Sequence, residues 1–312
     1  MIWYLPRLLR LAGNIRARLL GAVLLSACAI GSSVALLAVA SWLIVRASYH
    51  PPVLYLLVAV VAVRFFGIGR GVFRYTERLL SHESAFRALT SVRLAVYTKL
   101  ERLAPVGQMW RRGDLLTRLI DDIDSFAGLI TRALIPLMSI AVVMSAAVLV
   151  TGLIDPASGM LLAIAITCTI AVAWAVMMRD QSDEDALSVV RADRAAQVTE
   201  IVLGASDPGI GSAATRWLGR IDELDHREER LARRIARRAG IAQAAAILTM
   251  SGATAGIWGL AATTKGLAPE NAALIILLPL GLLELAALIP AGLTQLGRTR
   301  ISAERIFDVL NT

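Results

Sequence analysis

Four ionisable residues follow the second apolar run of the sequence at four-residue spacing: Arg70, Arg74, Arg78 and His82. In an α-helix this spacing forms one slowly drifting stripe along the surface. Guanidinium groups bind carboxylates through two parallel hydrogen bonds, so such a stripe can guide an anionic solute. The structural alternative is that the side chains extend toward the interface and pair with carboxylates such as Glu77. Because ionisable residues within a membrane span are usually functional, we expect at least one of the three arginines to contact substrate.

His82 is the histidine whose surroundings in the sequence suggest a ligand. Neutral imidazole binds iron, the arginines on the preceding turns can hold haem propionates, and Tyr75 and Phe86 can cover one face of the macrocycle. The alternative is a histidine that forms hydrogen bonds at the membrane surface. The sequence does not decide between the two, because it offers no evident second iron ligand. We therefore carry His82 as a candidate haem ligand and expect no other metal site.

Glu284 is the one charged residue in the last apolar run of the chain. A carboxyl group at that depth is expected to be protonated or to pair with an arginine. The functional interpretation is a partner for an arginine of the stripe, or a gate that responds to protons. The structural interpretation is a polar contact between helices. The sequence leaves both open.

The composition shows why these charges matter. Of the 312 residues, 57% are hydrophobic and 18% are charged, whereas soluble domains have about 45–50% and about 25%. Six runs are long and uncharged apart from Glu284, and a membrane span needs roughly 20 such residues. This pattern excludes a soluble enzyme, a disordered chain and a disulfide scaffold. The predicted spans are 19–45, 47–63, 133–154, 156–178, 239–264 and 271–297.

Arginine and lysine are concentrated in alternate connections between these runs. Residues 1–18 hold four, 79–125 hold seven and 179–238 hold eleven, whereas the other three connections hold at most one. The positive-inside rule then places both termini and the two long connections in the cytoplasm. Residues 1–18 have the pattern of an amphipathic helix at the interface. The net charge of +8 is thus explained by the arginine and lysine of the cytoplasmic connections, and we expect no nucleic-acid partner.

The two long connections have helical patterns. Phe86, Leu89, Val92 and Val96 recur at spacings of three and four, and residues 186–203 and 216–238 are rich in Ala, Leu, Arg and Glu. Short breaks that contain Gly and Pro interrupt them at 104–107 and 204–209. We predict two helical hairpins whose arms extend some 45 Å beyond the bilayer. Arms of that length need a partner to contact.

The segment from Arg74 to Arg87, RYTERLLSHESAFR, is similar to the second-helix signature of the CydC family. Members of that family form one half of the heterodimeric CydDC ABC transporters that support cytochrome bd assembly. Further segments that match follow in order at 113–124, 204–207 and 296–300, so the resemblance extends over nearly the whole chain. Ala127 stands where the family often has a carboxylate, which is a mild departure.

The resemblance implies an all-α membrane protein with the transmembrane domain of an ABC exporter (type I exporter, type IV). It implies three parts: an interfacial helix at 1–18, a six-helix domain with two long cytoplasmic hairpins at 19–300, and the start of a linker to a nucleotide-binding domain at 301–312. The chain has no GxxxxGK[ST] phosphate loop and no LSGGQ-like signature. We therefore expect that it is not itself an enzyme and that ATP and Mg²⁺ bind to a nucleotide-binding domain elsewhere.

The resemblance also implies a function and partners. The expected cargo is haem or a thiol such as cysteine or glutathione, moved across the bacterial plasma membrane. The expected partners are a CydD-like half-transporter, ATP-binding domains and membrane lipid, and haem is a candidate cofactor. The alternatives are a haem-binding or redox-sensing scaffold without an ATPase, and a generic multidrug or lipid exporter half. The stripe disfavours the latter, because apolar drugs do not need buried cations.

The residue types and the resemblance together assign roles to particular residues. The hairpin tips are expected to dock into ATPase domains. The residues expected to bind substrate are Arg70, Arg74, Tyr75, Arg78, His82 and Glu284. The residues expected at the coupling turns are Pro105, Gly107, Gly113, Gly204, Ser206 and Asp207.

Overall fold

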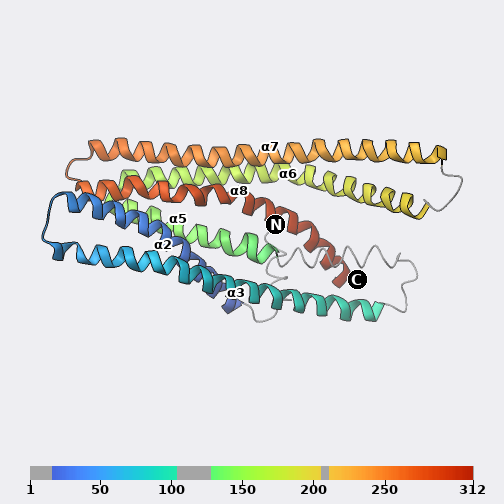
Figure 1. The fold of residues 1–312 in the computed structure, drawn as a ribbon, viewed down its shortest axis with the longest axis horizontal. Coiled ribbons are helices and arrows are strands. Elements are labelled where there is room, and N and C mark those ends of the chain that lie inside the picture. Colours follow the sequence, from blue (N-terminus) through green and yellow to red (C-terminus); the bar gives the residue numbers. More distant parts are fainter. Residues whose placement is uncertain (1–15, 104–127, 205–210, 312) are drawn as a thin grey trace.

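The computed structural model describes residues 16–103, 128–204 and 211–311, and within these ranges the regular structure is entirely helical. A single turn of 3₁₀-helix (η1, Val53–Tyr55) precedes α3, and a π-helical turn (η2, Ile130–Leu134) precedes α5. Figure 1 shows the long helices lying roughly side by side. They are α2 (Arg16–Ser48), α3 (Leu57–Leu103), α5 (Ile135–Ile154), α6 (Pro156–Gly204), α7 (Gly211–Thr263) and α8 (Pro269–Asn311).

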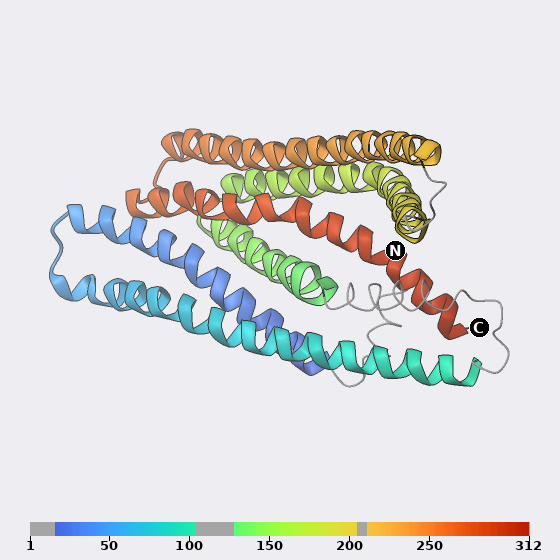
Figure 2. The same cartoon turned by 45° about the vertical axis from the view of Figure 1, so that its right-hand side comes forward.

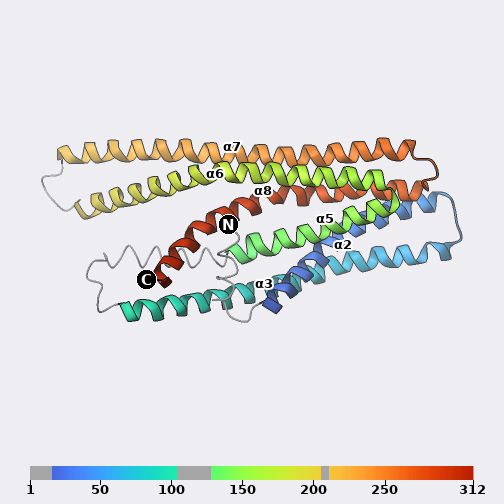
Figure 3. The same cartoon turned by 180° about the vertical axis from the view of Figure 1, so that it is seen from behind.

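Six of these helices are long and apolar enough to cross a membrane, as the sequence predicts. The predicted spans 19–45, 156–178 and 271–297 lie within α2, α6 and α8, and 133–154 and 239–264 match α5 and α7 to within two residues at one end. The prediction for the second span is wrong at its start: 47–63 includes the end of α2, the connection and η1, and α3 begins only at Leu57. The helices α3, α6 and α7 continue without a break into the predicted hairpin arms. At about 1.5 Å per residue, α3 is about 70 Å long. Figures 1 and 3 show the continuations of α3, α6, α7 and α8 on the same side of the molecule. We call this side the arm side and the opposite side, with the short connections, the loop side.

The core lies around α8, which packs against α2 on one flank and against α6 and α7 on the other (Figure 2). Its inward face consists of Ile275, Leu278, Leu282, Ala286 and Ile289, all less than a tenth exposed. The helix α3 differs from the others because α2 is its main neighbour. Only 6% of the most apolar stretch of α3 is buried within the chain, against 44% for α2.

The arm of α3 corrects one detail of the predicted pattern. Val92 and Val96 are fully buried, but Phe86 is 62% exposed. The buried face is completed by Ala85 and Ala88 instead. A helix face made of alanine lets the backbone of a neighbouring helix approach closely. The large ring of Phe86 therefore lies outside the packed face.

The connection between α5 and α6 on the loop side is a single residue, Asp155. Its backbone is extended, and its carboxylate accepts hydrogen bonds from the backbone N–H of Ser158 (2.9 Å) and from the Ser158 hydroxyl. Together with Pro156 at the first helical position, this is a standard start for α6. The tight reversal brings Gly152 and Gly159 together, and a Cβ built on Gly159 would lie 2.4 Å from the Cα of Gly152.

An ion pair marks the loop-side ends of α2 and α8. Arg46 Nη1 lies 2.8 Å from Glu270 Oε1, and the Glu270 side chain is 11% exposed. Arg46 stands in the last turn of α2 and Glu270 in the first turn of α8. The pair therefore holds the last turn of α2 and the first turn of α8 at the same height along the bundle.

Two further ion-paired groups mark the arm side. Arg18 Nη1 of α2 lies 3.6 Å from Glu83 Oε1 of α3. Arg238 of α7 bridges Asp180 (3.0 Å) and Asp183 (2.6 Å) of α6, and the Asp180 side chain is 4% exposed. Arg18, Asp180 and Arg238 lie at or next to the ends of uncharged runs, whereas Glu83 follows the charged part of α3. The second Asp180 oxygen, Oδ2, has no hydrogen-bond partner within the described residues.

The distance between these two levels matches a bilayer. Along α2, the helix rise puts Arg46 about 42 Å above Arg18, and a bilayer with its headgroup regions is about 40–45 Å thick. Beyond the arm-side level, Arg194 of α6 pairs with Asp225 (2.6 Å) and Glu228 (3.6 Å) of α7 and joins the two arms. The ion pairs thus set the depth of every residue in the spans.

The contact between Gly152 and Gly159 generates a first prediction. Gly159→Ala should lower the midpoint of thermal unfolding by several degrees, because the added methyl group overlaps backbone and overpacking costs about 1–3 kcal/mol. The matched control is Gly252→Ala in α7, where a Cβ meets nothing within 4 Å. The control should be neutral or slightly stabilising, since alanine is the better helix former. Equal effects of the two substitutions would contradict the packing.

A second prediction concerns Arg238. Arg238→Gln should destabilise the protein and separate the arm-side ends of α6 and α7, because it leaves the nearly buried Asp180 without its counter-charge. Arg194→Gln removes an equally short pair whose side chains are about half exposed, so its effect should be small. Thermal unfolding of both variants in the same lipid compares them directly. A larger loss for Arg194→Gln would contradict this ranking.

Candidate functional site

Arg70 of the stripe and Glu284 lie at the same depth. The helix rise places Arg70 about 20 Å above Glu83 at the arm side and Glu284 about 21 Å below Glu270 at the loop side. Each is therefore near the middle of the roughly 42 Å that separates the two levels. Charge at this depth is expensive, so both residues require a special environment.

Contacts with α2 support this common depth independently. A Cβ on Gly69, beside Arg70, would lie 3.8 Å from the hydroxyl of Ser32. A Cβ on Gly281, one turn before Glu284, would lie 3.2 Å from Leu37 and 3.7 Å from Val34. Both glycines thus meet α2 within about five residues of each other, on the two helices that flank it. The sequence could not show this, because it gives the position along each helix but not the register between helices.

The whole arginine stripe is exposed in this chain. Arg70, Arg74, Arg78 and His82 are all on the surface of α3, and Tyr75 is 71% exposed. None of the three arginines forms an ion pair with a described residue, and the expected pairing with Glu77 is not formed. An unpaired guanidinium facing hydrocarbon costs at least about 2.5–3.5 kcal/mol. This face of α3 must therefore border water or a second polypeptide.

His82 lies level with the arm-side ion pair, one residue before Glu83. It is exposed, and its ring is 6.4 Å from the ring of Phe86 with an angle of 33° between the planes. Arg78 stands one turn before it on the same helix. Within the described residues, no group of three or more histidine, cysteine, aspartate or glutamate side chains is placed to hold a metal ion. The site thus offers an accessible imidazole beside an aromatic face and a cation.

Glu284 is exposed on α8 in a row with Leu280 and Leu288, one helical turn on either side. It pairs with no arginine in the part of the chain that the structure describes. The expected contact between Glu284 and the stripe is therefore not made within this chain. The row faces away from the core, so Glu284 is available to solute, water or a partner.

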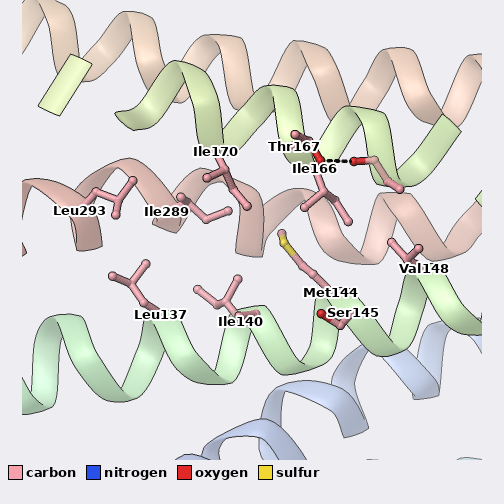
Figure 4. A pocket seen from close by; sticks show the side chains of 12 residues that line it. Leu137, Ile140, Met144, Ser145, Val148, Ile166, Thr167, Ile170, Ile289 and Leu293 are labelled. Carbon is pink, nitrogen blue, oxygen red and sulfur yellow. Dashed lines mark hydrogen bonds between the residues drawn. The ribbon is translucent and has the colours of Figure 1, made fainter. Parts of the chain in front are cut away.

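An apolar hollow of about 460 Å³, which the sequence does not predict, lies between α5, α6 and α8. Figure 4 shows side chains of the three helices around it, and none of those that line it is charged. The Thr167 hydroxyl is satisfied by the carbonyl of Ala163 at 2.8 Å. The hollow suits an apolar group rather than an anion. Apolar periodicity shows which faces are buried, but not where the facing side chains are too short to meet.

The predicted coupling turns are largely outside the described residues. Pro105, Gly107, Gly113, Ser206 and Asp207 all fall there. Gly204 is the last residue of α6, and α7 begins at Gly211, so the predicted reversal between these arms lies where the sequence puts it. Residues 301–311, expected to begin a linker, continue α8 as helix.

Comparison with known proteins gives no matching family model. Among curated proteins, the chain is 28% identical over 262 residues to the glutathione/L-cysteine transport system ATP-binding/permease protein CydC of Escherichia coli, covering 82% of this chain and 45% of that protein. It is 31% identical over 144 residues to the corresponding CydD protein of Bacillus subtilis, covering 46% of this chain and 25% of that protein. The chain thus spans less than half the length of these relatives.

Among solved structures, the chain resembles a bacterial Atm1-family ABC exporter with ATP bound. The TM-score is 0.76 at 14% sequence identity, over 96% of this chain and 54% of that one. At this identity the likeness establishes the fold. The chain is therefore an all-α membrane protein with the fold of an ABC exporter transmembrane domain, and its homologues are CydC and CydD transporter subunits.

Proposed function

We propose that this chain is the transmembrane half of an ATP-driven transporter that moves a small carboxylate-bearing solute across the bacterial plasma membrane. The observation that carries the proposal is the exposed, unpaired row of Arg70, Arg74 and Arg78 within the depth of the bilayer. Such a row is stable only beside water or a partner, and guanidinium groups recognise carboxylates. A second, CydD-like half supplies the opposite wall of the cavity.

The names of the relatives favour cysteine or glutathione as the solute, and both molecules carry carboxylates. We further propose that the transport supports cytochrome bd assembly, as the CydC resemblance implies. ATP and Mg²⁺ bind to nucleotide-binding domains outside the described residues, and the arms of α3, α6 and α7 carry the movement of those domains to the spans. The arms then lie in the cytoplasm, in agreement with the excess of arginine on that side.

Haem is a second candidate cargo because of the geometry at His82. An exposed imidazole, the nearby ring of Phe86 and the preceding Arg78 fit the iron, the macrocycle and a propionate respectively. When bound, haem would add an iron centre that takes the imidazole nitrogen as a ligand. The residues of this chain hold and orient it. The fit also accommodates a scaffold that binds haem without transporting it.

The thiol proposal predicts a binding defect in the stripe. In vesicles that contain the chain with its partner half and ATPase domains, Arg70→Gln with Arg74→Gln should raise the KM for glutathione roughly tenfold or more. A hydrogen bond to a charged group contributes about 1.5–3 kcal/mol, which sets this scale. The maximal rate should change less. Arg220→Gln, an exposed arginine far along the α7 arm, is the control and should leave the KM unchanged.

If the double variant at Arg70 and Arg74 transports glutathione with the KM of the wild type, the stripe does not bind this substrate. If glutathione neither is transported nor stimulates ATP hydrolysis by the wild-type assembly, the thiol proposal fails as a whole.

The haem proposal is tested by absorption spectroscopy. Titration of the assembly with haem should give a saturable Soret band that weakens or shifts in His82→Ala. The matched control is His226→Ala, an exposed histidine of the α7 arm next to Asp222. A band that is the same in wild type and His82→Ala would remove the ligand assignment and leave the thiol proposal standing.

A further inference from the structure

Three arginines of α7, Arg230, Arg234 and Arg237, form an exposed row on one face of the helix. Their spacings of four and three place them above one another on successive turns. None of the three forms an ion pair or a hydrogen bond with a side chain in the described part of the chain. Three like charges close together without a counter-charge repel one another, so an anion bound here would be stabilised.

The other arginines nearby on α7 do not share this property. Arg227 pairs with Glu223 and Arg233 with Glu229, each one turn earlier, at 2.6 Å and 2.5 Å. Arg238 is held by the α6 carboxylates described above. The unpaired row therefore differs from the arginines next to it on α7, which are neutralised.

The row points away from the rest of the molecule. The buried face of α7 consists of residues such as Ile235, Ala242 and Ile257, which lie about half a turn around the helix from the arginines. Figures 1 to 3 show α7 along one edge of the structure, with α6 and α8 on its inner side. No other part of the described chain covers the row.

The depth of the row matches the lipid headgroups. Arg238 lies at the arm-side level, so the helix rise places Arg237, Arg234 and Arg230 about 2 to 12 Å beyond it. On the same face, toward the bilayer centre, the exposed residues become apolar: Ile241 is 57% and Leu248 70% exposed. One continuous helix face thus changes from apolar to cationic where a bilayer changes from acyl chains to headgroups.

We propose that this face of α7 is a binding site for an anionic phospholipid of the arm-side leaflet. The phosphate group meets the row Arg230, Arg234 and Arg237, and an acyl chain lies along Ile241 and Leu248. The charge of the row selects anionic over zwitterionic headgroups, whose own ammonium group it repels. The inference needs only that the helices span a membrane, so it stands apart from the choice of transported solute.

The test uses the full chain, with any partner subunit that co-purifies, in an uncharged detergent. Fluorescently labelled phosphatidylglycerol and phosphatidylcholine are titrated separately, and binding is followed by anisotropy. Each basic group near an anionic lipid contributes roughly fivefold to binding. Replacing all three arginines by glutamine should therefore weaken phosphatidylglycerol binding by at least about tenfold. Phosphatidylcholine binding should hardly change.

Two further variants make the result decisive. Replacing the three arginines by lysine keeps the charge and should preserve most of the binding. Replacing Arg191, Arg194 and Arg220 by glutamine removes the same charge more than about 15 Å beyond the arm-side level. This variant should bind phosphatidylglycerol like the wild type.

Three outcomes would overturn the proposal. The wild type would bind both lipids equally, or the distant triple variant would lose as much binding as the row variant. In the third, the row variant would bind lipid normally and lose a co-purifying subunit instead, which would identify the row as a protein contact.

Discussion

The cost of placing charge in hydrocarbon is the constraint on which this structure depends. Six helices must cross a hydrocarbon layer in which an unpaired ion destabilises the protein by several kcal/mol. The chain meets this constraint by pairing its charges at the two edges: Arg46 with Glu270 on one side, and Arg18 with Glu83 and Arg238 with two aspartates on the other. These pairs fix how far each helix is inserted. The few charges left between the edges then stand out as exceptions that need water, a solute or a partner.

The sequence predicts the elements well because their signals are local. Uncharged runs give the number of spans and the bounds of all but the second, where Arg64 interrupts the run inside α3. The distribution of arginine gives the alternation of short and long connections, and Gly204 with the residues after it gives the end of α6. The length of the arms follows from helical periodicity that continues past the apolar runs. Each of these features depends on residues close together in the chain.

The site is less predictable because it depends on neighbours that are distant in sequence. The stripe on α3 is visible as a spacing, but its exposure follows from α3 packing mainly on α2. The equal depth of Arg70 and Glu284 depends on the register of three helices. The apolar hollow and the unpaired Oδ2 of Asp180 depend on how side chains from different helices fail to meet. A pattern in one helix contains none of this information.

The sparse packing of α3 has a consequence for the life of the chain in a cell. A span that is hardly covered by its own polypeptide, with guanidinium groups at mid-bilayer, is an incomplete folding product until a second subunit arrives. In cells, proteases continuously remove chains that are not fully folded. We therefore infer that this chain is degraded rapidly when it is made without a matching subunit. The ratio of the two subunits in the membrane is then set by which copies have assembled, because only assembled pairs escape degradation.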